Sequence, residues 1–229
     1  MNEVSPNASD WDRYWATQSV KDKTYNIIAN FYRRYLIRRS LNTAIKGIAT
    51  NSDRILHAGC GAGEVDVELH EFFSIISVDF SIGALLQYQD GHGPNAAIAQ
   101  ADILTLPFRS DSFNIIFNLG VMEHFTDAQI SNCLAEFNRV LELHGKLCLF
   151  WPPRWGLSVM ILHSLTWLFQ KIFRIELDLY PAEINLYSSR RRLKNTLEAN
   201  GFTLDSSKFG WSDLFTHQII TAQLATKCL

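Results

Sequence analysis

Short apolar runs alternate with helical patterns from residue 54 to residue 151, and this alternation constrains the fold more than any other feature. The runs include RILHAG, SIISVDF, FNIIFNLG and GKLCLFW, and amphipathic segments such as DAQISNCLAEFNRVLE lie between them. Strands that are apolar on both faces and are separated by helices form a mostly parallel sheet that is covered on both sides. The sequence therefore predicts a doubly wound α/β fold.

Two further strands are predicted at residues 201–209 and 217–226. The connection between them contains Gly210 and Trp211 and is too short for a crossover helix. Because parallel neighbours need such a crossover, these two strands must be antiparallel to each other.

The chain has 229 residues, of which 47% are hydrophobic and 19% are charged, and these values indicate a single globular domain over residues 1–229. Within it we expect an N-terminal helical region at 1–50 and a cap insertion at 152–192, before the last two strands. The apolar centre of this insertion, LSVMILHSLTWLFQKIF, is too short and too interrupted for a membrane span. It favours a helix that caps a pocket. An interfacial helix with peripheral membrane contact remains an alternative.

Charge and cysteine content bear on partners and compartment. The formal net charge is -2, so no overall positive field attracts nucleic acid. The four cysteines are widely spaced, and the start MNEVSPNASD has no basic stretch followed by an apolar run, which favours a reduced, cytoplasmic protein. His57 and Cys60 flank a glycine turn, but no second Cys/His pair stands at zinc spacing, so we expect no metal site.

The glycine turn Gly59–Gly63 follows the strand at 54–58, and we expect a helix to begin near Glu64. Glycines permit a tight turn and let a ligand approach the backbone. The dinucleotide fingerprint G-x-G-x-x-G needs a glycine where Glu64 stands, and a carboxylate there disfavours a pyrophosphate. The turn therefore favours a nucleoside without phosphates.

Asp79 ends the strand SIISVDF about 20 residues after the turn, where an acid can accept hydrogen bonds from ribose hydroxyls. The alternative role for Asp79 is a helix N-cap, which Ser81 can fill instead. Asp79 thus supports nucleoside binding without choosing among nucleoside cofactors.

Residues 53–151 resemble the class I S-adenosylmethionine-dependent methyltransferases, especially the small-molecule branch called type 11. The resemblance rests on ILHAGCGAG, VDFS, ADILTLPF and FNIIFNLGVMEHF in this order, followed by NRVLELHGKLCLFWPP. It implies a seven-stranded, Rossmann-like sheet whose last strand is antiparallel. It also implies S-adenosyl-L-methionine as cofactor and S-adenosyl-L-homocysteine as product.

The resemblance assigns cofactor contacts at the carboxyl ends of four strands. Those beneath the methionine and ribose portions are Gly59, Cys60 and Gly61; those for ribose and adenine are Asp79, Phe80, Asp102 and Ile103; those near the sulfonium are Asn118 and Leu119. One position departs from the family, because most members have an acid where this chain has His57. The polar contact of that acid to the methionine end must be replaced or absent, and the alternative for His57 is a strand-end histidine bonded to backbone.

Methyl transfer from a sulfonium requires the acceptor about 3–3.5 Å from the methyl carbon, in line with the breaking bond. For a hydroxyl or acidic-carbon acceptor, the candidate base is His124, which has Glu123 beside it. A capping or core histidine is the alternative, and an amine or carboxylate acceptor needs no base.

Aromatic residues around the predicted site favour a small, largely apolar or aromatic acceptor, although core packing is the alternative for each residue singly. The candidate pocket residues are Tyr14, Tyr25, Trp151 and Trp155. A non-catalytic, cofactor-binding partner subunit remains a second interpretation. A nucleic-acid methyltransferase is a third, less favoured one, because NLGVME lacks the N/D-P-P-Y/F pattern and only the basic cluster at 190–194 supports it.

Overall fold

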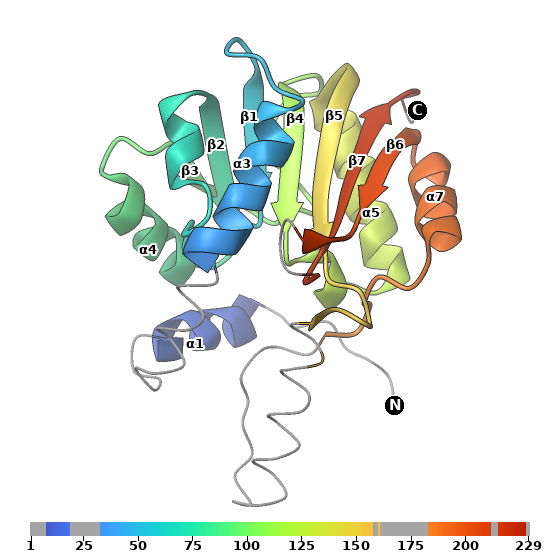
Figure 1. The fold of residues 1–229 in the computed structure, drawn as a ribbon. Coiled ribbons are helices and arrows are strands. Elements are labelled where there is room, and N and C mark those ends of the chain that lie inside the picture. The colour runs from blue at the N-terminus through green and yellow to red at the C-terminus, as the bar shows by residue number, and fades with distance from the viewer. Residues whose placement is uncertain (1–7, 19–32, 158–159, 161–182, 212–214, 228–229) are drawn as a thin grey trace, which may run out of the picture.

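The computed structural model describes residues 8–18, 33–157, 160, 183–211 and 215–227. Within these residues, seven strands form one sheet in the order β3-β2-β1-β4-β5-β7-β6 (Figure 1). Their bounds are β1 Arg54–Ala58, β2 Ser74–Asp79, β3 Ile98–Gln100, β4 Phe113–Leu119, β5 Leu141–Trp151, β6 Phe202–Lys208 and β7 Gln218–Leu224.

Strand directions confirm the predicted topology. The pairs β1–β2, β1–β4, β2–β3 and β4–β5 are parallel. Strand β7 is antiparallel both to β5 and to β6, between which it lies. The sheet is therefore mostly parallel with an antiparallel last strand, as the sequence predicts.

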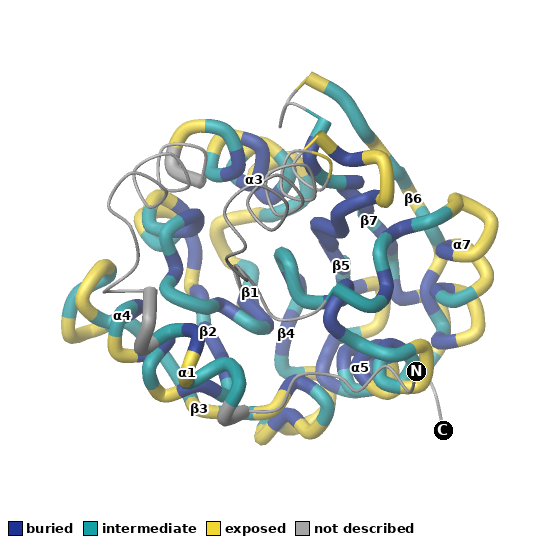
Figure 2. Tube along the Cα trace, turned by 90° about the horizontal axis from the view of Figure 1, so that it is seen from below, coloured by how far each residue is buried: buried dark blue, intermediate teal, exposed yellow. Residues whose placement is uncertain are grey.

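Helices cover both faces of the sheet because successive strand residues point to opposite sides. Ile55 of β1 packs in a cluster with Leu41 and Ile45 of α3 (Arg38–Lys46). The next residue, Leu56, packs in a second cluster with residues of α5 (Asp127–Val140) and α7 (Arg190–Ala199). Figure 2 shows the buried strands running between α3 and α5. This arrangement confirms the doubly wound fold.

Helix α1 (Ala8–Gln18) lies beyond the carboxyl ends of the parallel strands (Figure 1). It is held against α4 (Ile82–His92), because Ser81 Oγ donates a 2.5 Å hydrogen bond to Asp12 Oδ1 and Gln87 Nε2 donates to the backbone oxygen of Trp15. A π-helical segment, η1 (Arg33–Ile37), leads directly into α3. The described part of the N-terminal region is thus helical, as predicted.

The helix expected to begin near Glu64 is absent from the described chain, and this expectation is wrong. Residues 64–66 form turns, and a short 3-10 helix, η2 (Val67–Glu71), follows. The physical reason lies in the residues that bound this turn segment. Gly63 has a φ of 68°, and the Asp66 side chain is fully buried among polar partners. The chain bends to bury this carboxylate instead of winding into a regular helix.

The cap insertion predicted at 152–192 falls largely outside the described residues, so its central helix is untested. Its described end returns to the sheet edge, where Tyr187 forms a parallel bridge with Pro153. None of the helices in the described residues is long and apolar enough to cross a membrane.

Candidate functional site

The sheet order brings together the predicted cofactor residues, which are spread from position 57 to position 119. They lie at or just after the carboxyl ends of β3, β2, β1 and β4, four neighbouring strands of the sheet. The chain order reverses between β1 and β4, and open α/β sheets bind ligands at such a point. The geometry therefore assembles one candidate site at this edge.

The glycine turn after β1 requires glycine for steric reasons. Gly59, Gly61 and Gly63 have φ values of 73°, 52° and 68°, which side-chain-bearing residues rarely adopt. A Cβ at Gly59 would lie 2.6 Å from Cγ2 of Val121, and one at Gly63 would lie 2.3 Å from Cδ2 of Tyr88. The turn is thus closely packed from two sides.

Asp79 links the end of β2 to this turn. Its Oδ2 accepts a 2.9 Å hydrogen bond from the Gly61 amide, and its Oδ1 accepts one of 2.9 Å from the Ser81 amide. The side chain of Ser81 caps α4 by accepting from Ala84, as expected, and the ribose contact of Asp79 stays a prediction. Burial raises the pKa of the Asp79 carboxyl, although these amides oppose the shift.

The predicted adenine side is formed by two neighbouring loops. Gln100 Nε2 donates a 3.0 Å hydrogen bond to the backbone oxygen of Phe80, which joins the ends of β3 and β2. Asp102 is exposed and its Oδ1 accepts from the Leu104 amide, while Ile103 is buried in the core. Their contacts to adenine remain predictions.

Asn118 at the end of β4 is fully buried. Its Nδ2 donates a 2.6 Å hydrogen bond to the backbone oxygen of Ala58, which joins the ends of β4 and β1. Its Oδ1 has no hydrogen-bond partner among the described residues. A buried carbonyl oxygen without a donor costs free energy, and a ligand donor at this edge removes that cost.

Glu123 is a second buried polar group at this edge, on the short helix η3 (Met122–His124). Its Oε2 has no partner in the described part of the chain, and burial raises the pKa of its carboxyl to about 8. Its backbone oxygen accepts from the amides of Ile184 and Asn185, which anchor η3. In the sequence Glu123 stands out only as the neighbour of His124, because an acid after an apolar strand does not by itself predict burial.

His57 is bonded to the carboxylate of Asp66, a residue that no sequence motif singles out. Its Nδ1 lies 2.6 Å from Oδ2 of Asp66, and its ring stacks on Phe117 with centroids 4.1 Å apart. The alternative reading, a histidine bonded to backbone, is therefore corrected: the partner is a side chain. Cys60 is also buried, and burial together with the charges of Asp79 and Asp66 raises its pKa well above the usual value.

Three aromatic residues of α1 lie over this edge. A Cβ at Gly61 would lie 2.9 Å from the ring of Trp15, and the ring of Trp11 packs edge-on against His124 with centroids 4.9 Å apart. Tyr14 is buried and makes edge contacts with both tryptophans. Of the predicted pocket residues, Tyr14 thus lies beside the candidate site, and His124 is buried beneath α1.

Trp151 and Trp155 form a separate group near the end of β5. Trp151 Nε1 donates a 2.7 Å hydrogen bond to the backbone oxygen of Asn185, and Trp155 is 48% exposed, with its ring edge-on to Tyr187. Trp151 lines a pocket with Asn185, Tyr187 and the ion pair of Asp127 with Arg192. Tyr25 lies outside the described residues.

Comparison with known proteins identifies a domain type. Residues 55–145 match the family model of a methyltransferase domain. A protein of Encephalitozoon cuniculi named "Putative methyltransferase" is 28% identical over 110 residues, which are 48% of this chain and 48% of that protein. The chain therefore spans about half the length of the curated relative that it matches.

Solved structures share the fold. Magnesium protoporphyrin IX methyltransferase from Synechocystis PCC 6803, solved with bound SAH (S-adenosylhomocysteine), has a TM-score of 0.65 and 15% identity, and the match covers 96% of this chain and 95% of that one. The [4+2]-cyclase SpnF has a TM-score of 0.68 and 13% identity, with 97% of each chain covered. Since one neighbour is named as a cyclase, the fold alone does not determine the reaction.

The family match covers the strands and the glycine turn that form the candidate site, and the sheet order agrees with the structural neighbours. S-adenosylmethionine is the cofactor that this family uses. Residues 55–145 therefore match a methyltransferase domain, and the described chain shares its fold with a solved methyltransferase that binds SAH.

Proposed function

We propose that this chain transfers the methyl group of S-adenosylmethionine to a small, largely apolar acceptor. The observation that carries the proposal is the hydrogen bond from the Gly61 amide to Asp79 Oδ2, at 2.9 Å. It joins the glycine turn to a buried carboxylate at the point where the strand order reverses, which is the arrangement that suits a nucleoside cofactor.

The residues at this edge fit that cofactor. In the proposal Asp79 accepts from the ribose hydroxyls, Asp102 and Ile103 address adenine, and Asn118 and Leu119 lie near the sulfonium. Two features support this assignment: the buried Oδ1 of Asn118, which has no partner in the described part of the chain, and the turn, whose glycines have no Cβ. When bound, S-adenosylmethionine supplies a methyl group activated by the positive charge on its sulfur.

Glu123 is proposed to accept a hydrogen bond from the amino group of the cofactor's methionine end. The resemblance implies an acid for this end where this chain has His57, and His57 is bonded to Asp66. Glu123 Oε2 is buried without a partner among the described residues. Glu123 lies next to Gly120 and Val121, and Val121 packs on Gly59. A cation pairs well with such a carboxylate, because burial strengthens the attraction once the proton has left.

His124 is the proposed general base for a hydroxyl or acidic-carbon acceptor. Its ring packs against Trp11 of α1, whose aromatic residues would exclude water and present an apolar wall to the acceptor. Trp151 and Trp155 are proposed to contribute a second wall at the end of β5. The aromatic character of both groups is what favours a largely apolar acceptor.

Two measurements test the proposed function. Isothermal titration calorimetry should show one equivalent of S-adenosylhomocysteine bound per chain, and absence of binding would contradict the assignment of the site. Transfer of a labelled methyl group from S-adenosylmethionine to compounds in a cell extract should then identify an acceptor. Cofactor binding without transfer to any acceptor would favour the non-catalytic partner subunit.

A substitution isolates the role of Glu123. In the unaltered protein, affinity for S-adenosylhomocysteine should rise with pH toward about 8, since the carboxyl must lose its proton to pair with the amino group. Glu123→Gln should weaken binding by about 10-fold at pH 8 and remove this pH dependence. Glu198→Gln, at an exposed position of α7, is the matched control.

An unchanged affinity and pH profile in Glu123→Gln would refute the amino-group contact. A fall in turnover with unchanged affinity would likewise refute it and would make Glu123 a base. Calorimetry and turnover on the same two variants separate these results.

A further inference from the structure

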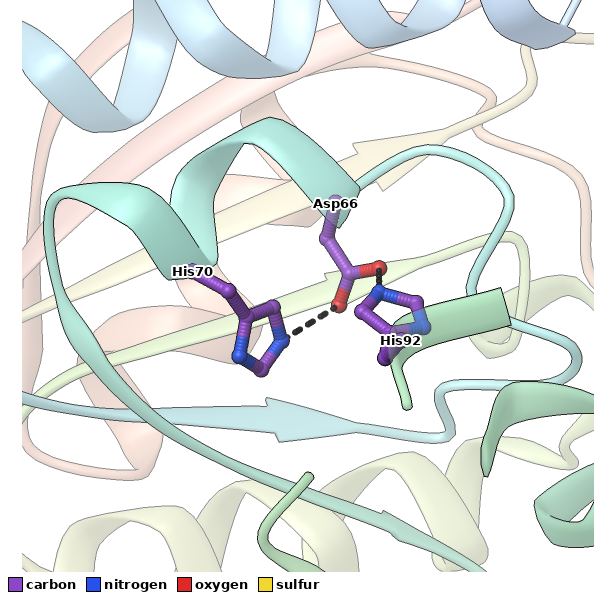
Figure 3. A group of neighbouring side chains, drawn as sticks. All are labelled: Asp66, His70 and His92. Carbon is purple, nitrogen blue, oxygen red and sulfur yellow. Dashed lines mark hydrogen bonds and ion pairs between the residues drawn. The ribbon is translucent and has the colours of Figure 1, made fainter. Parts of the chain in front are cut away.

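A cluster of ionisable side chains lies behind the glycine turn, on the side away from Asp79. Asp66 precedes η2, His70 lies one helical turn later at i+4, and His92 ends α4. Figure 3 shows the two imidazole rings pointing at the carboxylate of Asp66. His92 Nε2 is 3.0 Å from Asp66 Oδ1, and His70 Nε2 is 3.8 Å from Asp66 Oδ2.

The spacing of these atoms matches a metal site. One ligand atom from each of Asp66, His70 and His92 lies within 4.8 Å of the others. Ligands about 2.0–2.1 Å from an ion in tetrahedral geometry are about 3.3 Å apart. His92 Nε2 is 3.0 Å from Oδ1, close to this value, whereas His70 Nε2 is 3.8 Å from Oδ2 and lies 2.6 Å from the Tyr88 hydroxyl, which it must leave to bind an ion. Two imidazoles and one carboxylate are the donors that divalent zinc and its first-row neighbours take.

The hydrogen bonds of His92 require a positive charge between it and Asp66. His92 Nδ1 lies 2.9 Å from the backbone oxygen of Tyr88, which only accepts, so Nδ1 carries the hydrogen. In a neutral ring, Nε2 then presents a lone pair to Asp66 Oδ1. Two acceptors at 3.0 Å repel each other unless a proton or a cation lies between them.

Neighbouring side chains hold the carboxylate of Asp66 in place by hydrogen bonds. Asp66 Oδ2 receives His57 Nδ1 at 2.6 Å and the Tyr88 hydroxyl at 2.7 Å, which leaves Oδ1 for the shared charge. Hydrogen bonds of this kind orient the ligands of metal sites. Asp66 is fully buried, whereas the His70 side chain is 22% exposed and gives the cluster a route to solvent.

We propose that Asp66, His70 and His92 bind one divalent first-row transition-metal ion such as Zn²⁺. The ion ties η2 to the end of α4 and so braces the glycine turn from behind, since a Cβ at Gly63 would lie 2.5 Å from Cε1 of His92. Three protein ligands leave a fourth position for water. The site is separate from the proposed cofactor contacts, and its test needs no cofactor.

The test is metal binding by the whole chain. After treatment with a chelator and its removal, the protein should bind one equivalent of Co²⁺ with the visible absorption of a tetrahedral site. Zn²⁺ should displace the Co²⁺ and should raise the midpoint of thermal unfolding. His70→Asn should weaken Co²⁺ binding by at least about 100-fold, because losing even an outer-shell partner costs about 10–100-fold.

His144→Asn is the matched control, since His144 is exposed on β5 outside the cluster. It should bind Co²⁺ as the unaltered protein does. His70 is the most exposed of the three ligands, so its variant is the one expected to keep the fold, as circular dichroism will verify. Less than one equivalent of bound Co²⁺, or equal affinity in the His70 and His144 variants, would overturn the proposal. The charge between His92 Nε2 and Asp66 Oδ1 would then be a proton.

Discussion

Two buried carboxylates flank the same glycine turn and are held in different ways. Asp79, on the cofactor side, is bonded by the backbone amides of Gly61 and Ser81. Asp66, behind the turn, is bonded by the side chains of His57, His92 and Tyr88. Burial acts to raise the pKa of both carboxyls, and their hydrogen-bond partners decide whether the pKa ends above or below its usual value.

The pKa values show the consequence of this difference. Burial raises the pKa of Asp79, and the neutral amides do not offset the rise. Burial also acts to raise the pKa of Asp66, but the charge of His57 and the hydrogen bonds of the three histidines bring it well below the usual value. The Asp66 side is therefore expected to serve stability, and the Asp79 side to serve ligand binding.

Asp66→Asn should have the largest effect on folding. It removes the only carboxylate described within this histidine cluster and leaves buried polar partners uncompensated. The free energy of unfolding should fall by about 3–5 kcal/mol, as for other broken buried pairs. Urea denaturation at pH 7 measures it, with Asp90→Asn on the exposed face of α4 as control. An equal loss in Asp66→Asn and Asp90→Asn would mean that the buried carboxylate stabilises the fold no more than an exposed one does.

Alanine substitutions at two glycines of the turn compare the tolerance for a Cβ on the Asp66 side and on the Asp79 side. Gly63→Ala drives a Cβ to 2.3 Å from the buried Tyr88 ring, and both the positive φ and the overpacking should cost about 2–4 kcal/mol in unfolding free energy. Gly61→Ala meets Trp15 of α1 at 2.9 Å, and α1 can shift, so about 1–2 kcal/mol is expected. Thermal denaturation compares the two, and a greater loss at Gly61 would reverse the assignment.

Asp79→Asn should act mainly on cofactor binding. Hydrogen bonds to a charged group contribute about 1.5–3 kcal/mol, so affinity for S-adenosylhomocysteine should fall by about 10–100-fold. Calorimetry measures it, and urea denaturation of the same variant should show a smaller loss of stability than Asp66→Asn. If affinity stays unchanged while stability falls, Asp79 is a structural residue like Asp66.

Glu123 sharpens the comparison, because it is a buried acid whose Oε2 lacks any partner in the described chain. Its pKa is about 8 in the folded state against 4.5 as its ordinary value, so the folded protein keeps the proton that the unfolded chain loses. Wild-type stability should therefore fall as pH rises from about 4.5 to 8.

Glu123→Gln should be as stable as the wild type near pH 4.5 and more stable by about 3–5 kcal/mol near pH 8.5. Urea denaturation across this pH range measures the difference, again with Glu198→Gln as control. A pH-independent difference between variant and wild type would mean that Glu123 is ionised in the folded protein.

The strand pattern could be predicted because it depends on neighbours in the chain. β1, β2, β4 and β5 are apolar on both faces, and a short connection forces β6 and β7 to be antiparallel. The prediction of a helix near Glu64 was wrong because the geometry of that segment depends on residues distant in the chain. A buried Asp66 pulls that segment out of regular geometry, and its partners His57 and His92 lie 9 and 26 residues away.

The sequence by itself determined the α/β fold, the glycine turn and the acid at the end of β2, because each follows from periodicity or from the φ range that glycine allows. Tertiary structure alone decided that His57 is bonded to Asp66 and that Trp15 covers Gly61. It also decided that Glu123 is buried, with no partner for its Oε2 among the residues that the structure describes. Burial and hydrogen bonding set the charge of a side chain, and both depend on residues that only folding brings together.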